Sequence, residues 1–304
     1  MLSGCTEKPH PNPPPAKTRN PIHEPTPKDA QPQFHIKQFT SAAAAVQAAI
    51  HTNKPRIVGF GEFHQSKKDT ETRSAIARFS EEILPVIAPN SSDLIVETWQ
   101  PLGCGKTEER VVAEVKEVTE RPKQTESEVV RLIKKSKKLD VQPHILKVTC
   151  NDYEQLFQND AGTMDLYEML VLVGRLLKEK AVEAFHYRNQ AKQKLNPTHT
   201  VPDEMVLVYG GAIHNDSHPD EGWDEVAFGP HLFKTTQGEY LEIDLYVPEF
   251  IEANPLIKEE PWYPLFQKHA SQDKVILIQR NKDAYTLILK RGITTQTTLK
   301  TKQP

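Results

Sequence analysis

The feature of this sequence that most constrains its fold is a series of short, nearly uninterrupted apolar runs. Four of them are rich in β-branched residues and cover positions 56–60 (RIVGF), 93–97 (DLIVE), 144–148 (HILKV) and 205–209 (MVLVY). Such runs are typical of strands buried on both faces, as in a parallel sheet covered by helices. Further strands are predicted over 241–247, 275–279 and 285–289, and a turn at 281–283 favours an antiparallel hairpin between the last two.

Longer stretches with helical spacing lie between these strand patterns. They comprise a helix capped by Thr40 and ending near Ile50, a pattern over 76–87 that Pro85 disturbs, the charge-rich stretch 106–139 with a break at Pro122, and 163–194. Strands that alternate with helices are expected of an α/β domain. We therefore predict an α/β fold in which a mixed, largely parallel central sheet is covered by helices on both faces.

The first 33 residues differ in composition from the rest of the chain. Nine of the 24 prolines lie there, and no aromatic residue does. Such a segment cannot build a core, and proline favours extended polyproline II conformations. We therefore divide the chain into a disordered, proline-rich tether over 1–34 and a single α/β domain over 35–304.

The tether begins with a possible attachment point. Leu2-Ser3-Gly4-Cys5 resembles the lipobox of bacterial lipoproteins, in which the cysteine is lipidated, although the charged and apolar parts of a signal peptide are missing. A chance match is the alternative reading. A proline-rich spacer directly after the cysteine is what a lipid-anchored domain requires. The combination predicts an exported protein of the bacterial cell envelope that contacts the membrane through lipidated Cys5.

The cysteine count is consistent with export. If Cys5 carries lipid, Cys104 and Cys150 remain as an even pair, which an oxidising compartment would join. We therefore predict a disulfide between Cys104 and Cys150; two unpaired thiols in a cytosolic protein are the alternative. The absence of any CxxC excludes a zinc ribbon.

The charge balance limits the classes of partner. The chain carries 41 acidic and 38 basic side chains, a net charge of -3, so no overall field draws it to nucleic acid. No apolar run approaches the roughly 20 residues that a membrane-spanning helix needs. The expected partner is a small-molecule or peptide ligand.

Acidic and imidazole side chains follow three of the predicted strands. Glu62 and His64 come after the first strand in Gly-Phe-Gly-Glu-Phe-His, Glu97 ends the second, and His214 follows the fourth in Gly-Gly-Ala-Ile-His. Because ligands bind outside the carboxyl ends of strands in open α/β sheets, we expect these four side chains to meet in one cleft. The third glycine of a dinucleotide-binding fingerprint is missing, which argues against a nicotinamide cofactor.

These motifs resemble a known superfamily. Gly61-Glu62-Phe63-His64 after a strand, Glu97 at the end of the next, and the glycine-rich segment before His214 are similar to the erythromycin esterases, the ChaN haem-uptake lipoproteins and the Tiki metalloproteases. The resemblance covers residues 55 to about 220. It implies an α/β fold of that type and places Glu62, His64, Glu97 and His214 at the active or ligand-binding site.

The resemblance leaves three roles open. His64 could be a general base that activates water for attack on an ester or amide, oriented by Glu62 or Glu97, with His214 stabilising charge. Alternatively, the two histidines with Glu62 and Glu97 could hold a divalent metal such as Zn, Mn or Co. In the third role, a histidine contributes to haem binding without catalysis. The structural alternative is that strand-end Glu and His pairs only satisfy one another.

Other residues are secondary candidates. Arg73 could face the cleft and bind an anionic group, and Asp216, His218 and Asp220 could extend a metal site, although exposed arginines and solvated polar loops are the commoner case. Trp99 and Tyr209 flank the expected site and could line it or pack in the core. The remaining histidines that we considered show no informative spacing: His144, His186, His199, His231 and His269.

Overall fold

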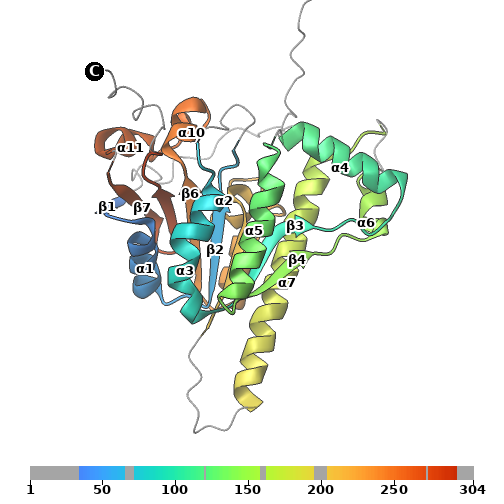
Figure 1. The fold of residues 1–304 in the computed structure, drawn as a ribbon, viewed down its shortest axis with the longest axis horizontal. Coiled ribbons are helices and arrows are strands. Elements are labelled where there is room, and N and C mark those ends of the chain that lie inside the picture. Colours follow the sequence, from blue (N-terminus) through green and yellow to red (C-terminus); the bar gives the residue numbers. More distant parts are fainter. Residues whose placement is uncertain are drawn as a thin grey trace, which may run out of the picture.

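The computed structural model describes residues 34–65, 72–119, 121–157, 162–194, 204–271 and 273–292. Their central element is an eight-stranded sheet with the order β1-β7-β8-β6-β2-β5-β3-β4 (Figure 1). Within this described part, β7 alone runs opposite to the other strands, which are all parallel to one another. The predicted α/β fold with a mixed, largely parallel sheet is therefore confirmed. Cys5 and the proposed tether up to residue 33 lie outside the described residues.

All seven predicted strands are present, with shifted ends. The strands are β1 (His35–Phe39), β2 (Ile57–Glu62), β3 (Ser91–Trp99), β4 (Gln142–Leu146), β5 (Met205–Gly211), β6 (Tyr240–Tyr246), β7 (Val275–Asn281) and β8 (Ala284–Ile288). The predicted hairpin between β7 and β8 is antiparallel, as expected. The strand β1 was not predicted, because it is a half-exposed strand at the edge of the sheet with mainly polar residues.

Helices cover both faces of the sheet. They are α1 (Ala42–Asn53), α2 (Ala75–Arg78), α3 (Leu84–Ile87), α4 (Lys106–Thr119), α5 (Gln124–Lys138), α6 (Cys150–Gln155), α7 (Leu166–Lys194), α8 (Ala212–Asn215), α9 (Gly229–Thr235), α10 (Pro248–Ala253) and α11 (Tyr263–His269). A π-helical turn (Phe79–Ile83) joins α2 to α3, and 3-10 turns cover Ala88–Asn90 and Ile257–Glu259. Among the described helices, none is long and apolar enough to cross a membrane.

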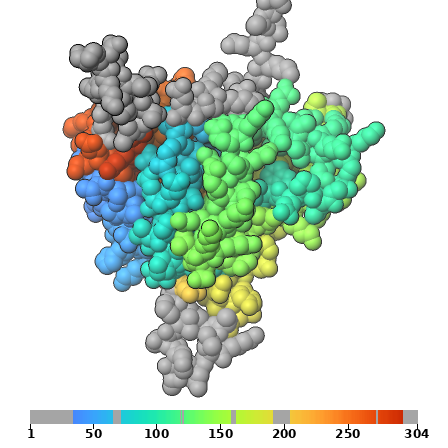
Figure 2. Space-filling view, in the orientation of Figure 1, coloured from blue at the N-terminus to red at the C-terminus, as the bar shows by residue number. Residues whose placement is uncertain are grey.

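Each face has its own apolar core. Residues of α1, α2, α3 and α5 pack on one face, and these helices form the near surface in Figure 2. Residues of α4, α6, α7 and α9 pack on the other, and a third cluster lies between α10, α11 and the β7–β8 end. The carboxyl-terminal end of α7 extends past the sheet (Figure 1), as the polar end of its sequence predicts.

One detail of the predicted helices is wrong and one needs refinement. Ser41, not Thr40, caps α1: its backbone is extended and its hydroxyl accepts a hydrogen bond from the amide of Ala44. The predicted disturbance of the second helix near Pro85 is present, but it lies before the proline. The π-helical turn precedes it, and the helix resumes with Pro85 in the first turn of α3, where a missing amide proton is tolerated.

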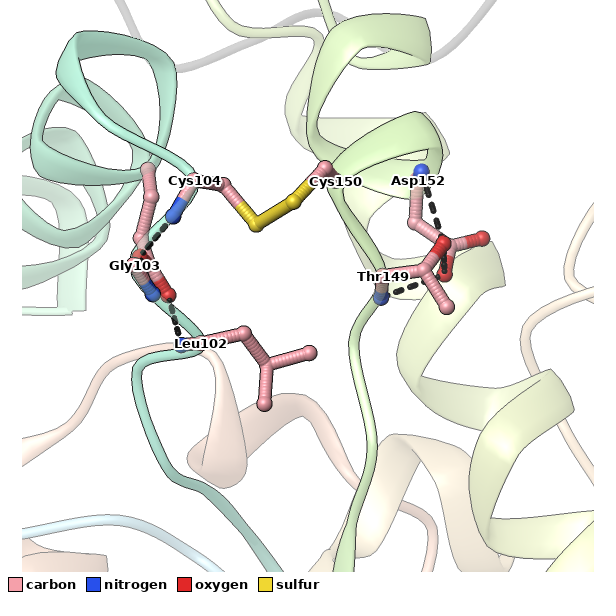
Figure 3. The surroundings of a disulfide bond; sticks show 7 residues. Leu102, Gly103, Cys104, Thr149, Cys150 and Asp152 are labelled. Atoms are coloured by element: carbon pink, nitrogen blue, oxygen red, sulfur yellow. Dashed lines mark hydrogen bonds between the residues drawn. A yellow bond between two sulfur atoms is a disulfide. The ribbon is translucent and has the colours of Figure 1, made fainter.

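A disulfide joins Cys104 and Cys150, as predicted, with 5.3 Å between the Cα atoms. Figure 3 shows that it connects two helix starts that are held by other bonds as well. The carboxylate of Glu108 accepts the amides of Leu102, Gly103 and Cys104 ahead of α4. Thr149 and Asp152 cap α6 reciprocally. The bond therefore ties the β3–α4 connection to the β4–α6 connection.

The amino-terminal end of β3 carries a buried acid with two basic partners. Asp93, which is 4% exposed, accepts hydrogen bonds from His144 Nε2 at 2.7 Å and from Arg188 Nε at 2.8 Å. Burial by itself would raise the pKa of Asp93, but the bonds from His144 and Arg188 outweigh it and lower the pKa to about 2. His144 thus has a structural role at the edge opposite the strand ends that carry the candidate site.

We expect Asp93→Asn to lower the free energy of unfolding near neutral pH by about 2 kcal/mol. The ordinary pKa of this carboxyl is 3.8, so its stabilising contribution is present above that pH and is lost as the pH falls toward 2. The difference in free energy of unfolding between wild type and variant should therefore disappear on acidification. Urea titrations from about pH 7 to pH 2 measure it, with the exposed Asp224→Asn as control. A gap that does not change with pH would contradict the assignment.

Candidate functional site

Glu62 and His64 form a hydrogen-bonded pair at the carboxyl end of β2. Glu62 is the last residue of the strand, and its Oε1 lies 2.7 Å from His64 Nδ1. The Tyr209 hydroxyl donates to the other carboxylate oxygen at 2.5 Å. Because a carboxylate only accepts hydrogen bonds, the contact between Glu62 Oε1 and His64 Nδ1 assigns the proton of neutral His64 to Nδ1. The Nε2 atom of His64 is then left with its lone pair.

Arg121 connects this pair to Glu97. It lies in the connection between α4 and α5, and its Nη2 is 2.5 Å from His64 Nε2 and 3.4 Å from Glu97 Oε1. The other oxygen of Glu97 accepts the amide of Gly211 at 2.5 Å. A Cβ atom on Gly210 would lie 2.8 Å from this same oxygen, so the approach of Glu97 to β5 requires a glycine there.

His214 lies on the adjacent segment, in the short helix α8 that follows β5. It is 2% exposed, and its Nδ1 lies 3.1 Å from the carbonyl oxygen of Val226, which assigns the Nδ1 proton. Its electrostatic neighbours are Glu97, His64 and Arg121. The structure therefore brings Glu62, His64 and Glu97 together at the carboxyl ends of β2, β3 and β5, and His214 lies on the segment that directly follows β5.

The protein environment sets the charges in this group. Burial would raise the pKa of Glu97, but the charges of His214, Arg121 and His64 lower it to about 2. Burial likewise opposes a lowered pKa for Glu62, but His64, Arg121 and Tyr209 outweigh it. Burial lowers the pKa of His214 despite the nearby Glu97. Near pH 7, both carboxylates are therefore ionised and His214 is neutral.

Solvent reaches the site through two of its members. The side chains of His64 and Arg121 are 30% and 25% exposed, whereas those of Glu62 and Glu97 are 9% and 13% exposed. The imidazole and the guanidinium are thus partly exposed to solvent, and the carboxylates that contact them are more deeply buried. Two small surface hollows, one lined mainly from α1, β1 and β7 and one from α6 and α7, contain none of these residues.

The secondary candidates do not join this group. Arg73 pairs with Glu81 at 2.5 Å and with Glu82 at 3.2 Å, on the exposed side of the following helical segment. Asp216 accepts the amide of His218, whose Nε2 lies 3.0 Å from Asp283 Oδ1. These two belong to a polar cluster beyond β6, not to an extended metal site. Trp99 packs against the core on the α7 face.

The residues present do not fit a metal ion. Within the described ranges, no three His, Cys, Asp or Glu side chains are grouped so that they could hold one. The guanidinium of Arg121 lies against His64 Nε2 and Glu97 Oε1, two of the atoms that a cation would need. The same arginine also occupies His64 Nε2, the nitrogen that would bind a haem iron.

Sequence reasoning missed Arg121 and understated Tyr209. Arg121 lies in a charge-rich stretch next to Pro122, where nothing in the local pattern distinguishes it from the other basic residues. Tyr209 was named only as a flanking residue, but it is fully buried against Phe79, with ring centroids 4.7 Å apart, and bonds Glu62. Its position on β5, directly opposite Phe60 of β2, is the signal that could have suggested the contact.

Comparison with known proteins leaves the family open. No family model and no curated protein matches the sequence. Among solved structures, the type III effector HopBA1 aligns with a TM-score of 0.39 and 10% identity over 87% of this chain and all of that one. A Bacillus cereus protein aligns with a TM-score of 0.34 and 13% identity over 70% of this chain and 72% of that one.

Proposed function

We propose that the protein is a hydrolase in which His64 activates a water molecule for attack on an ester or amide. The observation that carries this proposal is the Glu62–His64–Arg121 arrangement. A buried carboxylate holds one imidazole nitrogen, and the other nitrogen, partly open to solvent, has an arginine beside it. The resemblance to the esterase and metalloprotease superfamily motivates the same reaction class, with a small molecule or peptide as substrate.

The chemistry of the proposed step balances within these residues. His64 Nε2 takes a proton from water, and the water oxygen attacks the carbonyl carbon. Glu62, ionised and hydrogen-bonded to Nδ1, stabilises the imidazolium that forms. The guanidinium of Arg121 stabilises the negative charge that develops on the carbonyl oxygen. When the intermediate collapses, the proton on Nε2 passes to the leaving alcohol or amine.

In this mechanism Arg121 changes its partner during the reaction. Its Nη2 contacts His64 Nε2 in the present structure, so a water molecule can bind that nitrogen only after the guanidinium has shifted. The ion pair with Glu97 keeps the arginine at the site during such a shift. Glu97 itself is fixed by the amide of Gly211, so it provides a constant negative charge behind the moving cation.

We further propose that the enzyme acts in the cell envelope, anchored through Cys5. The disulfide between Cys104 and Cys150 supports an oxidising compartment, because such bonds are rare in the cytosol. The lipobox-like start and the proline-rich segment after it support the anchor.

The decisive assay measures hydrolysis of p-nitrophenyl esters and peptide p-nitroanilides by the full chain. We expect turnover of at least one class after exhaustive dialysis against chelator, because the proposed step uses no metal. Arg121→Gln should lower kcat by about 100- to 1,000-fold, the cost of removing one stabilising donor from an oxyanion. The matched control is Arg131→Gln, at a 62% exposed arginine of α5, which should leave kcat unchanged.

Three results would overturn the proposal. The first is that neither substrate class is hydrolysed by wild type. The second is activity that disappears with the chelator and returns with Zn, Mn or Co, which would support a metal-dependent reaction. The third is equal activity in Arg121→Gln and Arg131→Gln, which would remove the guanidinium from the reaction.

A further inference from the structure

The helix that carries His214 is too short to hold its own position. With four residues, α8 completes about one turn, and nucleating an isolated turn is unfavourable. Two contacts join His214 to the segment that follows α8. Its Nδ1 lies 3.1 Å from the carbonyl oxygen of Val226, and its main-chain carbonyl accepts the amide of Phe228 at 2.8 Å. The distance from His214 to the β2 residues of the site must be set by something else.

Asn215, the next residue, makes that connection. It is 1% exposed, and its Nδ2 donates to the main-chain carbonyl of Gly59 at 3.2 Å and to Asp244 Oδ1 at 3.1 Å. The Tyr240 hydroxyl lies 2.5 Å from Asn215 Oδ1 and 2.9 Å from its main-chain oxygen. The side chain therefore bonds β2 and β6 from one point of α8, and all its polar atoms have partners.

The backbone of β2 is shaped to receive this side chain. A Cβ atom on Gly59 would lie 1.8 Å from Asn215 Oδ1 and 2.3 Å from the Tyr240 hydroxyl. A Cβ atom on Gly61 would lie 2.3 Å from Asp244 Oδ1 and 2.7 Å from the Cα of Ala212. Such distances are far below normal contact, so the glycines on this face of β2 allow α8 to sit directly on the strand.

A charged network holds the partners of Asn215 in place. Arg280 Nη2 donates to Asp244 Oδ2 at 2.7 Å and also bonds Glu242. Glu242 Oε2 in turn accepts the amide of Ser217 at 2.7 Å. The segment that starts with α8 is thus attached to β6 at two points, Asn215 and Ser217. Both attachments lie on the face of the sheet that carries Gly59 and Gly61, opposite the face of the Glu62–Tyr209 contact.

We infer that Asn215 is a positioning residue that sets His214 relative to His64 and Glu97. It lies one residue from His214 and bonds the strand whose end carries Glu62 and His64. A displacement of α8 on β2 therefore changes the separation of the two imidazoles directly. The consequence for turnover rests on the proposed function, whereas the consequence for the His214 ring does not.

The test compares Asn215→Ser and Tyr240→Phe with wild type in the full chain. The serine is too short to reach β2 and β6 together, and the phenylalanine removes one partner of Asn215 with little change in volume. The matched control is Ile278→Val, at a fully buried residue of β7 that does not contact α8 through any of these bonds. NMR with ¹⁵N-labelled histidine reports the ring tautomer of His214, and ester hydrolysis reports kcat and KM.

We expect wild-type His214 to show a single Nδ1-protonated tautomer, and both variants to show a second tautomer or a shifted ring signal. In Asn215→Ser, kcat should fall about 10- to 100-fold with KM nearly unchanged, because Asn215 also bonds Gly59 on the strand that ends in Glu62, and misplacing a reacting group by about 1 Å is enough for such a loss. Tyr240→Phe should lie between that variant and wild type. Ile278→Val should leave both the His214 signals and kcat unchanged.

The two ideas fail in different ways. If wild type hydrolyses none of the substrates, the proposed function fails and the His214 signals alone decide on Asn215. If those signals are identical in wild type, Asn215→Ser and Tyr240→Phe, the inference is overturned even if the enzyme is active. If Asn215→Ser does not fold, Tyr240→Phe decides by the same criterion.

Discussion

His64→Ala should lower kcat for ester hydrolysis by about 100- to 10,000-fold, the usual contribution of a general base. The alanine leaves Glu62 and Arg121 in place but removes the nitrogen that accepts the proton. Because the site is partly open at His64, added imidazole should enter and restore part of the activity. Steady-state assays with and without imidazole, together with a thermal unfolding curve for each protein, make the comparison.

The matched control for this variant is His231→Ala, at an exposed histidine of α9. It should keep wild-type kcat and show no response to imidazole. Undiminished activity in His64→Ala would remove His64 from the mechanism. A loss that imidazole does not restore, in a variant that unfolds at a much lower temperature, would point to a structural role for the Glu62–His64 pair.

Replacing both Cys104 and Cys150 with serine should lower the free energy of unfolding by about 4 kcal/mol. The bond joins residues 46 apart in the sequence, and closing a loop of that length in the unfolded chain accounts for a loss of this size. Serine is close to a half-cystine in volume, and its hydroxyl can be solvated because Cys104 is partly exposed and Cys150 is exposed. Urea titration of the double variant and of the oxidised wild type measures the difference.

Reduction of wild type should reproduce the effect of the double variant. The helix starts on both sides of the bond keep their own hydrogen bonds, so the folded structure should survive the loss and the change should appear mainly in the denatured state. Thiol titration of the unreduced, denatured wild type should find no thiol other than that of Cys5, and only in protein whose Cys5 carries no lipid. Two further reactive thiols, or a double variant as stable as wild type, would contradict the prediction.

Much of the sheet could be predicted because its central strands are buried on both faces. Residues such as those of β2 and β5 are apolar throughout, so their pattern does not depend on knowing their neighbours. The short helices α8 to α11 and the edge strand β1 have no such internal pattern. Their conformation depends on tertiary packing, which local sequence does not express.

The residues of the candidate site also differ in whether the sequence alone could place them. Glu62, Glu97 and His214 could be placed because the ends of parallel strands meet at one edge whatever the order of the strands. Arg121 could not be placed, because its approach to His64 depends on how α4 and α5 pack and where the connection between them turns. Asp216 and His218 follow His214 closely in sequence, but the chain leaves the site at Asn215 and carries them past β6.

The strand order also determines when, during synthesis, the central strand β2 can pair with its neighbouring strands. Strand β2 pairs with β5 and β6, which start at Met205 and Tyr240, so about 140 residues are added after β2 before either partner exists. A growing chain therefore carries an apolar strand without a partner for about half of its translation, a state prone to aggregation. A protein that is exported before it folds would need a holding chaperone to keep Ile57–Glu62 from pairing with other chains.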